Sequence, residues 1–424
     1  MNVSRWKKES GMRKTLVFFV IAIIGSGCAG GKEFEAPGLP EVKAPDADKQ
    51  QAAESSNVFA LDLYARLQKE PGNLFLSPFS ISTALAMTYG GARGDTAAQM
   101  AQALHLDLQP EQLHPAFGAL QYDLAGDRKD KAYKLFIANA LWGQKGFTIL
   151  QPFLDLTAKN YGAGLRTVDF QRETEAARKT INNWVEERTN RKIKDLIKQD
   201  VLNPATTLVL TNAIYFLGEW LEPFKAENTN AGQFAKAGGG KVNVQMMHQS
   251  KTFSYGEGDA YQLLRLPYKA GDLEMAIFLP KAEDGLDAFE QELTLRELDA
   301  ALDAAKPERV RVSLPKFEMA AEFDLNDSLK KLGMNDAFVP GVADFTGIGG
   351  SKGDLFIAHV LHKAYVKVDE KGTEAAAATA VIMKGKAMPA EEKIFNADHP
   401  FFFVIRDGKT GVILFAGRLC DPAA

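Results

Sequence analysis

From about Ser55 onward the sequence shows a continuous pattern of apolar residues with no second low-complexity break. This pattern favours one large domain of roughly 370 residues, although a chain of 424 residues could also hold two or three average domains. The chain carries 50 Lys and Arg against 54 Asp and Glu, a net charge of -4. This balance gives no strong positive electrostatic field that would attract nucleic acid. The densest basic run, 188–198, is interpreted as a helix or loop face exposed to solvent.

Helical patterns dominate the first half of this domain, and strand patterns dominate the second half. Helices are predicted at 57–67, at 81–89 after Ser77-Pro78, and at 181–187. Strands are predicted at 206–217, 261–266, 273–279, 310–314 and 364–368. The clearest element is a hairpin of strands 401–405 and 412–416 around the turn 407–411. Helices followed by strands predict an α+β fold.

The first 27 residues have the composition of a signal peptide. A cationic stretch precedes an apolar run at 16–24, which is too short to span a bilayer comfortably. The following Gly25-Ser26-Gly27-Cys28 resembles a bacterial lipoprotein processing site, with glycine at a position where leucine is usual. Cys28 is therefore expected to carry a lipid, and ordinary cleavage with release is the alternative. Residues 28–52 are predicted to be a lipidated N terminus and flexible linker, followed by the domain at 53–422.

The predicted signal also predicts secretion across the inner membrane and, with the lipid, attachment to the cell envelope. In such an oxidising compartment, cysteines could form disulfides. Cys420 is the only cysteine besides Cys28. If Cys28 is lipidated, Cys420 has no partner in the chain, and the fold is expected to hold without a disulfide.

Three short motifs suggest an enzyme, but each lacks the context that its chemistry requires. Residues 349–353 place Ser351 in a G-x-S-x-G pattern, yet a glycine-rich loop precedes it and strand-like residues follow, where a helix is needed. The run 408–410 resembles the end of a phosphate-binding loop that lacks its first glycine. His359 and His362 would point to opposite faces of a strand, which argues against shared metal ligation. The sequence therefore predicts no catalytic machinery.

An alanine-rich segment follows the strand predicted at 364–368. Residues 373–388 contain no proline, because the first one is Pro389, so every backbone N–H could pair within a central strand. Small residues occupy alternate positions, which would share one face of that strand: Thr373, Ala375, Ala377 and Thr379. Alanine propensity favours a helix, but the run has no large apolar face to dock one. The segment is therefore either an exposed linker or a strand that can enter a packed sheet.

Two segments resemble inhibitory serpins. Residues 396–405 are similar to the C-terminal signature of that family. Further similarity at 73–81, 181–185, 211–220 and 361–364 extends the resemblance over about 55–422. The other segment is similar to the hinge of the reactive loop: Glu370, Lys371, Gly372, Thr373, Glu374, Ala375, Ala376, Ala377, Ala378 and Thr379. The resemblance implies three β-sheets, eight or nine helices and an exposed reactive centre loop at about 370–393.

The resemblance implies that the loop is bait for a serine protease. The usual register of the family places the scissile bond between Lys386 and Ala387, and a lysine there implies a trypsin-like target. Lys384 and Met383 are alternative sites of cleavage. After the protease is acylated, the loop would insert as a new central strand, a form of strand addition for which serpins are a known example.

Other matched positions imply how the sheet opens and how the loop is held. Four polar residues resemble the cluster beneath the central strands that controls their parting: Ser77, Ser80, Asn212 and His362. Trp220 resembles the tryptophan where insertion begins, and an exposed pair of Lys316 with Glu370 would contribute about 0–1 kcal/mol. The resemblance also implies a monomer that needs no cofactor or metal. The alternative is a non-inhibitory serpin acting as a binding or chaperone protein, which would normally carry bulky, charged or proline residues in its hinge.

Overall fold

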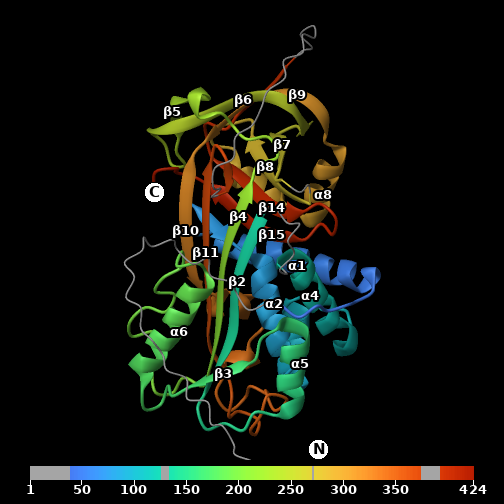
Figure 1. Ribbon diagram of the computed structural model, residues 1–424, viewed down its shortest axis with the longest axis vertical. Helices are drawn as coiled ribbons and strands as arrows, with labels where there is room; N and C mark the ends of the chain where they lie inside the picture. Colours follow the sequence, from blue (N-terminus) through green and yellow to red (C-terminus); the bar gives the residue numbers. More distant parts are fainter. Residues whose placement is uncertain (1–38, 126–132, 270–271, 374–391) are drawn as a thin grey trace, which may run out of the picture. The chain divides into compact units, whose positions relative to one another are not determined.

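The computed structural model describes residues 39–125, 133–269, 272–373 and 392–424 (Figure 1). Nine α-helices lie within these ranges: α1 Asp46–Leu67, α2 Pro78–Tyr89, α3 Gly94–Ala103, α4 Pro110–Ala125, α5 Gln151–Tyr161, α6 Thr174–Arg188, α7 Leu286–Glu292, α8 Leu295–Ala304 and α9 Asn326–Lys331. Two short 3-10 helices accompany them: η1 Ala226–Asn228 and η2 Asp336–Phe338.

Fifteen strands lie within the same ranges. The first eight are β1 Leu74–Leu76, β2 Tyr133–Gln144, β3 Leu165–Val168, β4 Leu208–Glu219, β5 Thr229–Ala235, β6 Lys241–Glu257, β7 Tyr261–Pro267 and β8 Leu273–Pro280. The others are β9 Lys306–Pro315, β10 Phe317–Asp324, β11 Ile357–Asp369, β12 Gly372–Thr373, β13 Lys393–Asn396, β14 Phe401–Asp407 and β15 Ile413–Leu419.

Local sequence signals account for several helix ends. Helix α2 begins at Pro78, whose fixed φ and missing N–H suit the first position of a helix. Helix α5 ends at Gly162, which has a φ of +60° and forms a left-handed C-cap. Helix α8 begins with a capping box, in which the Thr294 hydroxyl and the Glu297 carboxylate bond to each other's backbone N–H.

The strands form two hydrogen-bonded networks. One is a six-stranded sheet in the order β10-β11-β12-β4-β2-β3. The other has nine strands in the order β1-β15-β14-β8-β7-β6-β9-β13, with β5 paired to β6. The resemblance implies three sheets, whereas the described strands form two networks. Strand β6 is 17 residues long and pairs with β5, β7 and β9, so all of these strands belong to one network. The α+β fold expected from the sequence is confirmed.

The six-stranded sheet lies between two layers of helices (Figure 1). Helix α6 covers one face, where Ile181 and Val185 pack with residues of β2, β4 and β11. Helices α1, α2 and α4 lie on the other face, and this side holds the larger hydrophobic core. The sheet is therefore apolar on both faces, as is expected of a sheet covered on both sides.

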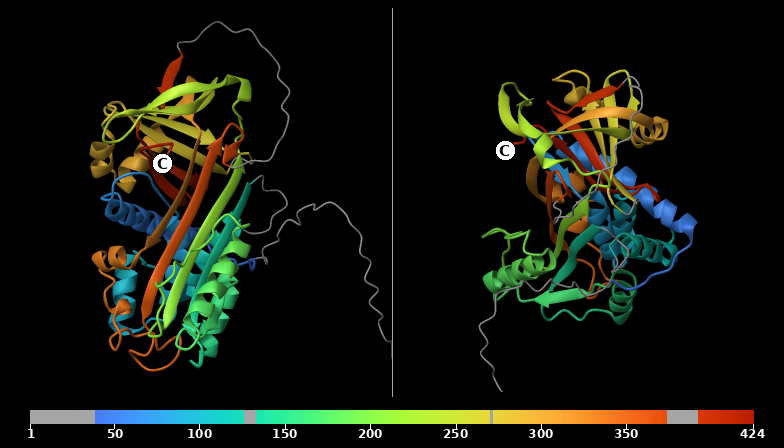
Figure 2. Two further views of the ribbon diagram at one scale, coloured as in Figure 1. Left: turned by 90° about the vertical axis from the view of Figure 1, so that its left-hand side faces the viewer. Right: turned by 45° about the horizontal axis from the view of Figure 1, so that its top comes forward.

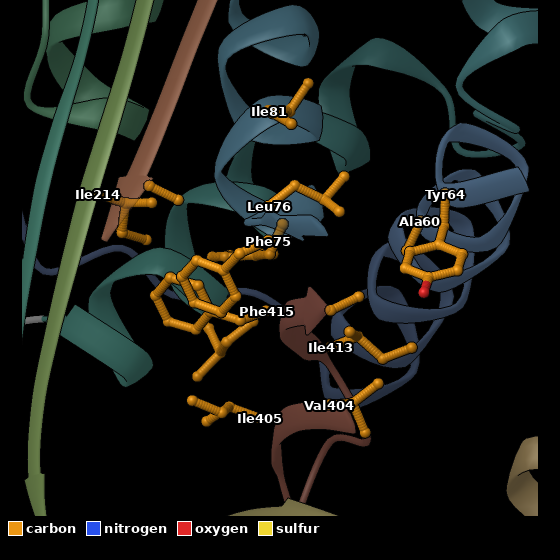
Figure 3. Close-up of a cluster of buried hydrophobic side chains, with 14 of the residues drawn as sticks. Ala60, Tyr64, Phe75, Leu76, Ile81, Ile214, Val404, Ile405, Ile413 and Phe415 are labelled. Atoms are coloured by element: carbon orange, nitrogen blue, oxygen red, sulfur yellow. The ribbon is translucent and has the colours of Figure 1, made fainter. Parts of the chain in front are cut away.

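The larger core is centred on the β14–β15 hairpin (Figure 3). Phe75 of β1 stacks on Phe415 of β15 with ring centroids 5.1 Å apart, and Tyr64 of α1 meets the edge of Phe402 at 5.1 Å. Val404 and Ile413 are fully or almost fully buried in the same cluster. The hairpin predicted from the sequence thus forms with the predicted turn at its tip, where Gly411 has a φ of +75°.

The start of the ordered domain differs from the boundary predicted at residue 53. Helix α1 begins at Asp46, and Ala52 and Ala53 are fully buried. Val42 also lies close to α4, because a Cβ added to Gly118 would be 3.2 Å from its side chain. The interpretation of residues 46–52 as flexible linker is therefore corrected: packing against α4 orders them.

The first half of the domain also contains a strand that was not predicted from the sequence. Strand β2 has 12 residues and pairs along nearly its whole length with β4. Its partner lies far away in the sequence, so local periodicity gave little sign of it.

Cys420 is buried and free, and burial raises the pKa of its thiol to about 11. Within the described ranges, no helix combines the length and apolar character needed to cross a membrane.

Candidate functional site at the β4–β11 seam

Strands β4 and β11 run side by side along the six-stranded sheet and pair in parallel (Figure 2). We call this pairing the seam. It ends at Tyr365 of β11 and Tyr215 of β4, and beyond this point β12 lies between the two strands. Thr373 of β12 pairs with Val368 on one side and Gly218 on the other, antiparallel to both. One end of the seam therefore already holds the first residues of an additional strand.

Both residues of β12 are buried. Gly372 has a φ of +154°, and a Cβ there would lie 2.0 Å from the carbonyl oxygen of Gly218, so only glycine fits. Thr373 has no exposed surface, and its hydroxyl lies 2.7 Å from the hydroxyl of Tyr268. The threonine thus enters the sheet with its polar atom hydrogen-bonded, as burial of such a group requires.

Trp220 fixes the turn that leads from β11 into β12. Its indole stacks on Tyr268, with ring centroids 4.5 Å apart and planes at 16°. The Nε1–H donates to the carbonyl of Asp369 at 3.0 Å, and the backbone N–H donates to the carbonyl of Lys371 at 2.8 Å. The side chain predicted from the resemblance to lie where insertion begins is therefore in direct contact with that turn.

Glu370 anchors the start of the loop through its side chain. Its carboxylate accepts hydrogen bonds from Lys316 at 2.8 Å and from the Thr229 hydroxyl at 2.9 Å. The Glu370 side chain is only 16% exposed, so this ion pair is more buried than the exposed pair expected from the sequence. Burial opposes ionisation, but the bond from Lys316, a backbone bond and the Thr229 bond outweigh it. They hold the pKa of Glu370 below its ordinary value.

A second carboxylate holds the chain where it leaves the loop. Glu392 accepts a hydrogen bond from the Ser250 hydroxyl and pairs with Arg311 at 2.6 Å and Arg309 at 3.6 Å. The bond from Ser250 and the pairing with Arg311 lower the pKa of this carboxyl. Strand β13 follows and pairs in parallel with β9. The strands that flank the loop, β12 and β13, thus belong to different sheets.

A buried polar cluster lies beneath the middle of the seam. The backbone N–H of Ser77 donates to Nε2 of His362 at 3.1 Å, so Nε2 accepts and the proton is on Nδ1, which donates to Oδ1 of Asn212. The Asn212 amide then donates to the Ser80 hydroxyl at 2.7 Å, and that hydroxyl donates to Asn139 at 3.0 Å. His362 and Asn212 are register partners across the seam. The cluster therefore joins β4 and β11 by side chains as well as by backbone.

The protonation state of His362 follows from its surroundings. The ring is fully buried, and this burial lowers its pKa to about 3 although the bond to Asn212 acts in the opposite direction. The imidazole is therefore neutral at physiological pH, as its accepting bond from Ser77 requires. His359, the other histidine considered as a metal ligand, instead bonds to Asp324 at 2.7 Å.

The structure brings together part of the predicted site and adds residues that were not predicted from the sequence. The six positions matched to the sheet-opening region all lie along the seam or at its upper end: Ser77, Ser80, Asn212, Trp220, Lys316 and His362. Hinge residues 374–379 and the bait positions Met383, Lys384, Lys386 and Ala387 lie outside the described residues, as does Cys28. Residues not singled out beforehand are Asn139, Thr229, Tyr268 and Glu392, none of which belongs to a recognisable motif.

Within the described ranges, the enzyme-like motifs found in the sequence lack the context that their chemistry requires. Ser351 is exposed in a turn, where its backbone N–H donates to Asp354, and the strand after it begins only at Ile357. The buried His362 donates and accepts only within the polar cluster. What the seam offers is two strand edges, already parted at one end by the residues that precede the loop.

Comparisons with known proteins agree with this geometry. The family model described as serpin (serine protease inhibitor) matches residues 54–422. The chain is 42% identical over 386 residues to the leukocyte elastase inhibitor of Homo sapiens, covering 88% of this chain and 100% of that protein. It is 39% identical over 431 residues to an uncharacterized serpin-like protein of Thermococcus kodakarensis, covering 97% and 99%.

A solved structure gives the same answer for the fold. The crystal structure of Serpin48 from the insect Tenebrio molitor matches with a TM-score of 0.78 at 35% identity, covering 88% of this chain and 98% of that one. The residues matched by the family model, 54–422, contain both sheets and the seam. From the sequence matches, the shared fold and the strand seated at the end of the seam, we conclude that this chain belongs to the serpin family of serine protease inhibitors.

Proposed function

We propose that this serpin inhibits trypsin-like serine proteases as a suicide substrate. The protease serine attacks the carbonyl carbon of the bait residue, and an ester bond replaces the peptide bond as the new amino terminus leaves. The loop then enters the seam and carries the acylated protease away before water can hydrolyse the ester. The observation that supports this proposal most strongly is β12, which already pairs with both β4 and β11.

The geometry of the seam gives a physical reason for insertion. If the residues after Thr373 continued β12 between β4 and β11, the parallel hydrogen bonds that now join β4 to β11 would be lost. The inserted strand would instead form antiparallel hydrogen bonds with β4 on one side and with β11 on the other. Each inserted N–H and C=O could then pair, and antiparallel pairing is slightly more stable per residue. By strand alternation, the small residues Ala375, Ala377 and Thr379 would follow the buried Thr373 on one face.

The proposed specificity rests on the loop sequence. A lysine at position 386 suits a protease whose specificity pocket contains a carboxylate, such as trypsin. The human relative, by contrast, is named as an inhibitor of leukocyte elastase. Cleavage after Lys386, after Lys384 or after Met383 would give different products, so mass spectrometry of the released C-terminal peptide identifies the bond.

We further propose that the protein is a monomer held at the cell envelope by a lipid on Cys28. The cationic stretch, the short apolar run and the small residues before this cysteine support the proposal. The full-length protein is expected to partition into the detergent phase of a phase-separating detergent, and Cys28→Ser is expected to move it to the aqueous phase. If both proteins partition alike, the lipid anchor is wrong.

The experiment that tests inhibition is incubation with trypsin followed by denaturing electrophoresis. An inhibitor leaves a covalent band with the summed mass of the serpin and the protease. We expect this band with trypsin, and we expect Lys386→Ala to reduce its rate of formation. Leukocyte elastase serves as the comparison protease: a complex with elastase alone would contradict trypsin-like specificity. Cleavage without any covalent band would favour a non-inhibitory serpin.

A further inference from the structure

A single lysine lies against both strands of the seam at the point where they part. The Nζ atom of Lys192 is 5.8 Å from the ring centroid of Tyr215 on β4 and 5.7 Å from that of Tyr365 on β11. The two tyrosine rings are themselves 5.8 Å apart. Tyr215 and Tyr365 form the last register pair of the seam before β12 lies between the strands. The three side chains therefore span the fork, and we call them the Lys192 clasp.

The backbone around Lys192 is held firmly to α6. The N–H of Lys192 donates to the carbonyl of Thr189 at 2.9 Å, and the N–H of Ile193 donates to the Thr189 hydroxyl at 3.2 Å. Ile193 is buried in the cluster that packs α6 onto the sheet. Farther along, Asn182 of α6 exchanges two hydrogen bonds with the backbone of Ile197, at 2.9 and 2.8 Å. The segment that follows α6 thus holds the Lys192 cation against the two tyrosines.

Insertion of a strand would break the clasp. A strand that enters between β4 and β11 separates them by one additional strand spacing, about 4.8 Å. A cation contributes to a ring when it lies within about 6 Å of the centroid, and Lys192 is already close to that limit for both rings. If Nζ keeps its present height above the rings, this widening places each centroid about 7 Å from it, and the inserted strand occupies the space midway between the rings. The lysine could then remain with one tyrosine or with neither, but not with both. The clasp therefore stabilises the closed seam and not the opened one.

We propose that Lys192, Tyr215 and Tyr365 act as a latch that sets how readily the seam opens beyond β12. This inference rests on the proposed function, because it concerns the insertion step of inhibition. Lys192 is a positioning residue that acts through the two tyrosines. It slows uncontrolled entry of the intact loop, and it must be released when a protease has been acylated.

The test compares Lys192→Met with wild type in two forms of the full chain: the intact protein, and the protein cut within the loop by a metalloprotease. The methionine keeps the length of the side chain and removes its charge. Lys194→Met is the matched control, because Lys194 lies on the same segment but pairs with Glu186 at 3.7 Å. Lys192→Arg should restore the latch, since a guanidinium also binds aromatic faces.

For Lys192→Met we expect a lower Tm of the intact protein and an unchanged Tm of the cut protein. When the intact variant is incubated warm, its inhibitory activity should be lost about two to five times faster than that of wild type. This is the rate factor that corresponds to the loss of one exposed cation–π contact. Lys192→Arg and Lys194→Met should behave as wild type does. An equal fall in Tm for both forms would overturn the latch, and so would a variant indistinguishable from wild type. If wild type forms no covalent complex and gains no stability on cutting, the proposed function fails, and the latch with it.

Discussion

The β14–β15 hairpin and the β4–β11 seam both cross the middle of the fold, but different interactions hold them. The hairpin is antiparallel, and Phe403 within it packs against Phe75 and Phe317 at centroid distances of 5.9 and 5.8 Å. The seam is parallel, forks at one end, and has His362 and Asn212 hydrogen-bonded across it in a buried cluster. The hairpin is held by apolar burial, whereas the seam combines apolar packing on both faces with a buried polar cluster that crosses it.

This difference indicates where the fold can change. Phe415 of the hairpin touches Phe216 of β4, but Tyr64, Phe75 and Phe317, which also pack on the hairpin, lie outside the seam. We therefore expect the hairpin to be largely the same before and after insertion. The backbone bonds of the seam can be replaced by those of an inserted strand. A fold of this kind can persist in its native form because opening is slow, not because that form has the lowest free energy.

The largest expected effect comes from blocking the open end of the seam with Thr373→Arg. Thr373 has no exposed surface, and the group bonded to its hydroxyl is the Tyr268 hydroxyl, which cannot neutralise a cation. Burial of an unpaired guanidinium there costs several kcal/mol, so the loop should fail to insert. We expect trypsin to cut this variant without forming the covalent band. Thr373→Val, which keeps the shape, is the control and should still trap the protease; trapping by the arginine variant would contradict insertion along this seam.

A change in the hairpin should instead affect the whole fold. Phe403 is fully buried, and Phe403→Ala is expected to lower the free energy of unfolding by about 3–5 kcal/mol. The loss should be similar for intact protein and for protein cut in the loop, measured by denaturant unfolding of each form. If only the intact form loses stability, the hairpin takes part in the transition and the contrast with the seam does not hold.

Mild acid should weaken the seam through His362. Its pKa is lowered from 6.5 to about 3 in the fold, so between these values the unfolded chain binds a proton that the native chain does not. Stability is therefore present above pH 6.5 and falls as the pH decreases, by at most about 1.4 kcal/mol per pH unit for this residue. Buried His114, with a pKa of about 4, adds a similar slope. Denaturant unfolding at several pH values from neutral into mild acid should show the loss.

The contribution of His362 can be separated from that of His114. His362→Gln should flatten the slope of stability against pH but not abolish it. His114 remains in this variant, and between its folded pKa of about 4 and its ordinary value of 6.5 it binds a proton in the unfolded chain but not in the native one. His114→Gln serves as the comparison, since His114 lies on α4, away from the seam. An unchanged slope in the His362 variant would mean that the seam histidine does not control the acid response.

The smallest expected effect is at the anchor of the loop. Lys316→Met removes the ion pair to Glu370 and leaves that carboxylate with the Thr229 hydroxyl. Since the lysine is 37% exposed, we expect a loss of about 1 kcal/mol or less, measured as the urea midpoint of the intact protein. Lys316→Arg should keep the pair and the midpoint. A loss as large as that of Phe403→Ala would show that the anchor, and not the core, limits stability.

The same contrast separates what could be predicted from the sequence from what could not. The hairpin was predicted because its two strands are adjacent and its turn chemistry is local. The seam residues were matched only through the family resemblance, since nothing near His362 in the sequence indicates that it faces Asn212. Asn139 and Tyr268 were missed because tertiary structure alone brings them to the site. The start of α1 was missed because the burial of its first turns depends on a distant helix.

The measurement that tests the central claim most directly is a comparison of Tm by scanning calorimetry before and after a single cut in the loop after Met383, Lys384 or Lys386, so that the segment following Thr373 stays whole. If the seam accepts the freed segment as a central strand, the cut protein gains two antiparallel ladders, and its Tm should rise clearly above that of the intact protein. If the Tm stays the same or falls, the loop does not enter the seam, and inhibition by strand insertion is contradicted for this serpin.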